Sequence, residues 1–301
     1  MKKGLVLVLI GLCSLVLVGY SSDDESKIGE NTFSSRPWET LENIGVEENT
    51  IFTLIDEMQD ELEIRLHEMV NQTSGIVGLS YYCLTTGRHI EINANGHFFA
   101  ASTIKLPTHM IIAELVRDGR LSWDQQLTFT SKDFRGGSGI LKYNTQPGNT
   151  FTVAELMIYS IAYSDNIAHW LLFHTFSDRE QLTSSIFNRY LPGEPVVGRL
   201  IMTPNQLTKI FKALYRDKDQ IEGYGTILEH MMDTSWTNRF ATELADGYVA
   251  HTPGWSDPYS HDSGIFFTEH PYILVIMTSG VPSAPDFLSK VSDTVFQFHY
   301  Q

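Results

Sequence analysis

Apolar residues recur three or four positions apart over residues 48–71, which predicts an amphipathic helix. Two segments with a period of two follow, Gly75–Leu84 and Arg88–Ala94, and Thr85–Gly87 between them predicts a β-hairpin turn. Further strands are predicted where residues alternate or run apolar near the C-terminus, at 247–252, 263–268 and 272–280. Helical spacing returns in 285–300 and predicts a terminal helix.

The pattern in the middle of the chain predicts mainly helices and loops. A helix is predicted from Ser102, but Pro107 removes the amide that would bond the carbonyl of Thr103, so we expect a kink or loosened first turns. Residues 152–170 predict a helix broken near Ser164. Two more helices are predicted downstream, at 207–215 and 225–232, the first opened by Thr203 as N-cap and Pro204.

This order of elements predicts an α+β fold. The early hairpin pairs with the late strands in one antiparallel sheet, helices from both chain ends cover it, and an all-helical lobe is inserted. The predicted sheet lobe covers about 46–100 and 205–301, and the helical lobe about 101–204. We expect a ligand cleft between the lobes.

The N-terminus differs in composition from the rest. Lys2 and Lys3 precede an apolar run, so residues 1–22 predict a secretory signal or N-terminal anchor, too short for a comfortable membrane span. Tyr20 stands where a lipoprotein signal has its cysteine. Residues 23–45 are rich in Ser, Asp, Glu and Asn and predict a polar linker. We therefore expect export, either as a secreted protein or attached to the outer face of a bacterial cytoplasmic membrane.

Composition narrows the function classes. The 301 residues are 42% hydrophobic and 19% charged, as in ordinary globular proteins, and can bury a large core. A formal net charge of −15 argues against nucleic-acid binding, and no protein partner is indicated, so a monomer is expected. Beyond the signal, Cys83 is the lone cysteine and is predicted to be a buried apolar residue.

Ser102 and Lys105 form an S-x-x-K sequence at the start of the predicted helix. Residues three apart share a helix face, so the lysine amine can reach the serine oxygen. Burial favours the neutral amine, which can then act as a base for the hydroxyl. Ser164 and Asn166 belong to an S-D-N sequence, whose hydroxyl could donate a proton to a leaving group while the amide binds a substrate carbonyl. Ordinary helix capping is the alternative for this motif.

Together the two motifs resemble the serine β-lactamase and penicillin-binding protein superfamily, closest to the class A β-lactamases, which carry S-x-x-K, S-D-N and K-T-G. Similar segments follow in the family's order at 118–121, 137–141, 152–156 and 164–168. The resemblance spans about 46–301. It implies a β-lactamase-like fold and an acyl-enzyme on Ser102 with a β-lactam or cell-wall peptide, without a metal or cofactor. Lys105 would accept the proton and Ser164 would protonate the departing nitrogen.

The third motif departs from the family's pattern. Aligned on Gly254, the lysine becomes Thr252 and the threonine becomes Pro253, and the amide of Trp255 becomes the second oxyanion donor. Aligned instead on Thr252, the lysine becomes His251. The first register is preferred, so Asn166, Thr252, Gly254 and Trp255 are the predicted substrate-binding residues. Either register loses a permanent cation, which His251 or His261 would replace only in part.

Class A enzymes use a glutamate as the base for the water that hydrolyses the acyl-enzyme. That glutamate is also absent from its expected place. With Asn188 aligned to the family's asparagine, Ser184 stands where that glutamate should be, and Glu194 and Glu180 are remote substitutes. We therefore expect slow deacylation. A D-alanyl peptidase or esterase of the penicillin-binding type, and a catalytically degenerate envelope binding protein, remain alternatives.

Overall fold

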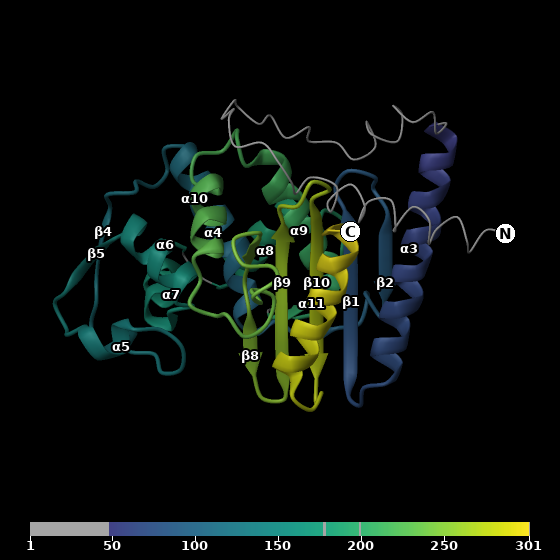
Figure 1. Cartoon of the computed structure of the whole chain (residues 1–301). Helices are drawn as coiled ribbons and strands as arrows, with labels where there is room; N and C mark the ends of the chain where they lie inside the picture. The colour runs from purple at the N-terminus through teal and green to yellow at the C-terminus, as the bar shows by residue number, and fades with distance from the viewer. Residues whose placement is uncertain (1–47, 177–178, 199, 301) are drawn as a thin grey trace, which may run out of the picture. The chain divides into compact units, whose positions relative to one another are not determined.

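The computed structural model describes residues 48–176, 179–198 and 200–300 (Figure 1). The predicted signal and linker, residues 1–45, lie outside this part. Residues 52–301 form one compact unit. Its element order is a helix, two strands, a mainly helical block, more strands and a terminal helix, as the sequence predicted.

One antiparallel sheet forms the centre of this unit. Its strand order is β2-β1-β10-β9-β7, and β8 also pairs with β9. The early hairpin therefore lies beside the late strands, because Leu79 of β1 pairs with Ile276 of β10. The strands are β1 (Ile76–Cys83), β2 (His89–Ile92), β7 (Val249–His251), β8 (Gly254–Ser256), β9 (Tyr259–Phe266) and β10 (Tyr272–Ser279).

Both faces of the sheet are buried, and successive side chains along each strand point to opposite faces. Alternate residues of β1 and β10 pack with α3 (Glu48–Asn71) and α11 (Ala284–Tyr300), which cover one face (Figure 1). Buried members of this layer include Leu66, Leu79, Leu274 and Leu288. Cys83 belongs to it as a free thiol that is 1% exposed, so its prediction as a buried apolar residue is confirmed.

The opposite face meets the mainly helical block. Here α9 (Pro204–Asp217) packs on β1 and β10, and residues such as Ile273 and Val275 join the larger apolar cluster. The same cluster includes residues of the remaining helices, α4 (Lys105–Arg117), α6 (Val153–Ala162), α7 (Asn166–Phe173), α8 (Arg179–Tyr190) and α10 (Tyr224–Met232). The expected break near Ser164 is confirmed, since α6 ends and α7 begins on either side of it.

Smaller elements complete the block. They are β3 (Phe98–Phe99), β4 (Gln126–Thr128), β5 (Thr150–Thr152), β6 (Ile201–Met202), α5 (Leu141–Asn144) and two 3-10 turns, η1 (Ala101–Ile104) and η2 (Ser131–Asp133). In the described ranges, none of the helices combines the length and apolar character needed to cross a bilayer.

The strands differ from the sequence predictions in three respects. The strand expected at 263–268 runs from Tyr259 to Phe266. Strand β8 was not predicted, because three residues beside a proline carry too little periodicity. The lobe expected to be all-helical, at about 101–204, also contains the short strands β4, β5 and β6, whose two or three residues are too few to show a period of two. The loosened first turn expected near Pro107 is confirmed, since Ser102 lies in the 3-10 turn η1 and the α-helix begins at Lys105.

Candidate active site

Ser102 lies in η1, between a short β-ladder and helix α4. Strand β3 pairs with β6, and the amide of Ala100 donates to the carbonyl of Leu200 at 2.8 Å, which fixes the entry to this turn. Ala101 then adopts φ +48°, a region that costs a non-glycine residue free energy. The strained backbone and the following helix start present Ser102 to a cleft.

The Lys105 side chain is 5% exposed and its amine is held by three oxygens. The Nζ atom lies 2.6 Å from the Ser164 carbonyl, 2.9 Å from Asn166 Oδ1 and 3.1 Å from Ser164 Oγ. Two of these atoms can only accept, whereas the hydroxyl can also donate. In its charged form the amine donates to all three oxygens. In its neutral form it has two N–H donors and one lone pair, which can accept from the Ser164 hydroxyl.

Burial lowers the pKa of Lys105 to about 7, because desolvation disfavours the ammonium, while the Asp165 carboxylate opposes that shift. The histidines behind the amine do not add a positive charge. His109 and His169 have lowered pKa values, both mainly through desolvation and secondarily through neighbouring cationic groups. The amine is therefore suited to exchange a proton near neutral pH.

The S-D-N loop caps a helix and also brings Ser164 to the cleft. Asp165 caps α7 by accepting from the amides of Ile167 and Ala168, and Ser164, at φ +48°, turns toward the cleft. The Asp165 carboxylate also accepts from the amide of Leu141 at 2.8 Å. A Cβ added to Gly139 would lie 2.1 Å from this carboxylate, so the neighbouring loop must be glycine there.

Asn166 clamps the same loop from the other side. Its Nδ2 donates to the Gly136 carbonyl at 2.8 Å, while Oδ1 accepts from Lys105. These two contacts position the lysine, and Asn166 is not among the residues that line the cleft. Its role at the substrate stays a prediction.

A narrow crevice of about 10 Å³ lies beside the two serines, which is room for about one water molecule. Small-molecule sites usually enclose 300–1,000 Å³, so the crevice is nearly closed in this structure. The lining side chains come from the helical block and from β8 and the loops around it: Ser102, Ser138, Ser164, Trp236, Arg239, Pro253, Gly254 and Trp255.

Four of the seven predicted site residues line the cleft, namely Ser102, Ser164, Gly254 and Trp255. Lys105 bonds Ser164 and Asn166 bonds Lys105, so these two lie behind the lining. Among the described residues, no hydrogen bond joins Ser102 Oγ to Lys105 Nζ or to Ser164, and the two serines are related by the cleft that they share. Thr252 lies at the edge, where its backbone bonds Ser263.

The predicted register of the third motif fits the geometry. A Cβ added to Gly254 would lie 3.0 Å from Thr103 Cγ2 and 3.1 Å from the Ala100 carbonyl, so β8 approaches the turn that holds Ser102 as closely as glycine permits. The edge ladder is interrupted at Thr252 and Pro253, between β7 and β8, as expected from the missing proline amide.

The expectation that His261 replaces the lost lysine is wrong. Its Nε2 donates to the Phe99 carbonyl and its Nδ1 accepts from the Thr278 amide, which defines the neutral tautomer. Burial lowers its pKa to about 4. His251 is also enclosed, with its Nδ1 on the Asp262 carboxylate, and does not line the cleft.

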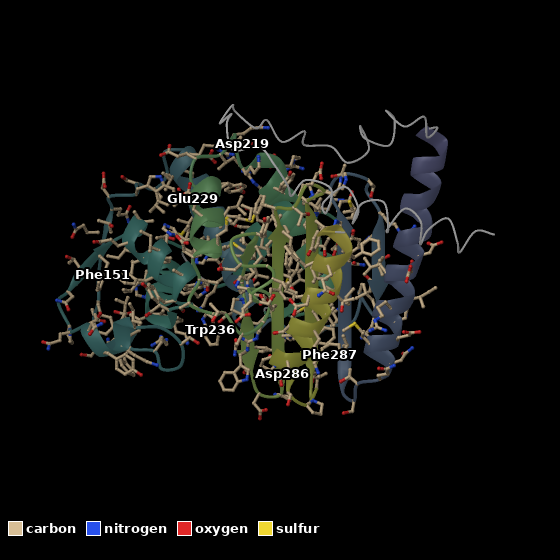
Figure 2. All side chains as sticks on the ribbon, viewed as in Figure 1. Phe151, Asp219, Glu229, Trp236, Asp286 and Phe287 are labelled. Carbon is tan, nitrogen blue, oxygen red and sulfur yellow. The ribbon has the colours of Figure 1, made fainter. Side chains whose placement is uncertain are left out.

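Arg239 is the cation in this cleft, and sequence reasoning missed it. The residue is 3% exposed, and its side-chain hydrogen bonds among the described residues are 3.4 Å contacts to Asn238 and Ser260. Its Nε has no partner there, and the guanidinium faces the ring of Trp236 at 5.3 Å. Figure 2 shows Trp236 where the helical block meets the strands.

Desolvation lowers the pKa of Arg239, opposed by the charge of Asp262. A buried, weakly bonded cation is costly unless an anion joins it. The segment before β7 carries no motif that marks Arg239, so only its packing against β9 shows its position at the cleft.

The candidates for a deacylation base are not among the residues that line the serine cleft. Asn188 lies on α8 and, with Arg189, lines a second cavity, so its alignment to the family's asparagine is not supported. Ser184 and Glu180 lie on the same helix, and Glu194 bonds Lys209. Of the side chains described here, none that lines the serine cleft is a carboxylate.

The fold and this serine–lysine cleft define a protein of the serine β-lactamase and penicillin-binding protein superfamily, close to the class A enzymes. Residues 61–299 match the model of the beta-lactamase enzyme family, and the chain belongs to that family.

The relatives are distant. Beta-lactamase VEB-1 of Pseudomonas aeruginosa is 20% identical over 226 residues, which cover 68% of this chain and 76% of that protein. The structure of PBP-A matches with a TM-score of 0.71 at 20% identity, over 79% of this chain and 95% of its own. A beta lactamase from Xanthomonas campestris matches with a TM-score of 0.69 at 22% identity, over 80% and 98%. These solved structures show the shared fold.

Proposed function

We propose that the protein is a serine β-lactamase-like hydrolase in which Ser102 forms an acyl-enzyme with β-lactams. The Ser102 Oγ–carbon bond forms as the ring carbon–nitrogen bond breaks. The serine proton passes to the neutral Lys105 amine, and the ring nitrogen receives a proton from Ser164. The observation that carries this proposal is the amine with a pKa of about 7, bonded to a hydroxyl that shares a cleft with Ser102.

Ser164 provides the route for both proton transfers. When the amine is neutral, the Ser164 hydroxyl can donate to Lys105 and accept from the Ser102 hydroxyl. After the ring opens, the same hydroxyl donates to the nitrogen and regains a proton from the lysine. General acid–base transfer requires groups within hydrogen-bond reach. The 3.1 Å contact with Lys105 Nζ meets this condition, and the cleft shared with Ser102 supports Ser164 as the relay.

The developing oxyanion would lie between the amides of Ser102 and Trp255. Both residues line the cleft, and the first belongs to the turn that leads into α4. The N-terminal end of a helix favours negative charge, which adds to the effect of the two donors.

Arg239 would bind the carboxylate that β-lactams carry. It supplies the permanent cation that Thr252 cannot, and its weak present contacts leave donors for a bidentate bond. Substrates with a carboxylate should therefore acylate Ser102 faster than matched neutral ones.

Deacylation would be slow, because no carboxylate in the described lining of the cleft can activate water. A related case is a mutant form of PBP-A, which was solved as an acyl-enzyme complex with penicillin G and matches this chain with a TM-score of 0.69 at 20% identity. A persistent adduct would be the main product with this protein.

The test follows a chromogenic cephalosporin by colour and by intact mass. We expect a stoichiometric colour burst, an adduct that persists, and loss of both in Ser102→Ala. Ser185→Ala is the matched control, since that serine lies on α8 and lines the second cavity instead of the serine cleft. The absence of both colour and adduct would refute the proposal and would favour a non-catalytic envelope binding protein.

A D-alanyl peptidase or esterase is the second candidate. The absent carboxylate and the interruption of the edge ladder at Pro253 favour it, because both features suit an acyl-enzyme that awaits another acceptor. Release of D-alanine from a peptide ending in D-Ala-D-Ala, dependent on Ser102, would support this reading over β-lactam hydrolysis.

The exported location is also a proposal, based on the sequence of residues 1–22. Fractionation of cells that express the full chain tests it: a purely cytoplasmic protein with an intact N-terminus would contradict export.

A further inference from the structure

A buried cluster of charged side chains lies behind the cleft, outside the relay. The Asp262 carboxylate on β9 is fully buried, and the Nδ1 atom of His251 lies 2.8 Å and 3.0 Å from its two oxygens. The amides of Ser263, at 2.8 Å, and Phe240, at 3.2 Å, donate to the same carboxylate. Because a carboxylate only accepts, the His251 Nδ1 must carry a hydrogen.

Arg239 is next to Phe240 in the chain and senses the charge of Asp262, which raises its pKa against desolvation. Nevertheless, the described residues include no ion pair between Arg239 and Asp262. The nearest carboxylate to a buried guanidinium would normally pair with it. Here the imidazole and two amides occupy that carboxylate instead.

We propose that His251 is a positioning residue for substrate selectivity: by occupying Asp262 it keeps Arg239 unpaired, so that the guanidinium is available to the carboxylate of an anionic substrate. This inference rests on the proposed function for its substrate class. It predicts that removing the imidazole donor lets Asp262 pair with Arg239, which weakens recognition of anions and leaves the reaction with neutral substrates nearly unchanged.

The experiment compares benzylpenicillin with its methyl ester. The readout is the second-order rate constant for adduct formation on Ser102 with benzylpenicillin divided by that with the methyl ester, both measured by intact mass. A general loss of structure slows both substrates together, whereas the proposal moves the ratio.

In His251→Leu the ratio should fall about tenfold, the expected effect of losing one charge-assisted contact. His251→Asn keeps a donor near the Nδ1 position and should hold the ratio within about threefold of the natural protein. In the double variant H251L/D262N the competing carboxylate is gone, so the ratio should recover. In Arg239→Ala the ratio should approach one, and adding H251L should not change it further.

Two results would overturn the proposal. One is an equal slowing of both substrates in H251L, and the other is a ratio that H251L/D262N does not restore. Since H251L can fail to fold, Asp262→Asn alone provides a second test. The proposal expects its ratio to be retained or higher, whereas a carboxylate that simply orients Arg239 would give a lower one.

Binding to Ser102→Ala separates this inference from the proposed function. Calorimetric titration of that variant with the same two compounds, with and without H251L, reports anion recognition in the absence of acylation. If the natural chain forms no adduct but the difference in affinity between the two compounds depends on His251, the proposed chemistry fails and the proposed role of His251 stands. If adducts form but His251 changes neither the ratio of rate constants nor the ratio of affinities, only the proposed role of His251 fails.

Discussion

The protonation of Lys105 gives the most demanding prediction, because acylation should follow the neutral form of its amine. A folded-state pKa of about 7, lowered from 10.5 by burial, places this titration in the physiological range. About one-tenth of the amine is neutral at pH 6, half at pH 7 and nine-tenths at pH 8.

The rate constant for acylation should therefore rise about tenfold per pH unit below pH 6, about fivefold between pH 6 and 7, and level off above pH 8. Lys105→Arg should abolish the rise and most of the rate, because a guanidinium stays charged.

The assay is stopped-flow measurement of adduct formation with a chromogenic cephalosporin from pH 5 to 9 at constant ionic strength. Circular dichroism at each pH confirms that the protein stays folded. Ser185→Ala should show the same profile at nearly the same rate, because that serine lines the second cavity.

A flat profile, or a rise centred near pH 9 or above, would refute the reasoning. The first result would mean that another group takes the serine proton. The second would mean that the three oxygens around Nζ stabilise the ammonium more than desolvation disfavours it.

Three further predictions concern stability. Between pH 7 and 10.5 the amine of Lys105 is protonated in the unfolded chain and neutral in the folded one. From pH 8 to 10 the unfolding free energy of the natural protein, measured in urea, should therefore rise by about 1 kcal/mol per pH unit relative to that of Lys105→Met. The same pH dependence in both proteins would contradict this. Gly139→Ala places a Cβ against Asp165 at φ +108°, so it should cost about 3 kcal/mol and slow acylation several-fold, and unchanged kinetics would show that the loop adapts. Leu66→Ala should cost about 3 kcal/mol with the acylation rate retained, since the side chain is fully buried on the far face of the sheet.

Local patterns predicted much of the fold because they are set by neighbours in the chain. The period of two in β1 and β10 reflects two buried faces, and the helical spacing of 48–71 and 285–300 reflects one apolar stripe on each helix. Strand β8 escaped prediction because three residues beside a proline carry too little periodicity.

Within the site, the sequence by itself determined the chemical groups that depend on short spacing: Ser102 and Lys105 one turn apart, and Ser164 with Asn166 flanking a capping aspartate. Their spacing follows from helix geometry, which needs no distant partner.

Only the tertiary structure decided which cation faces the cleft. His251 and His261 looked like substitutes for the missing lysine, yet both are enclosed by partners from other segments, and Arg239 lines the cleft instead. Charge and protonation depend on burial and on through-space neighbours, and those are fixed when β7, β8, β9 and the preceding loop pack together. A one-dimensional pattern records neither.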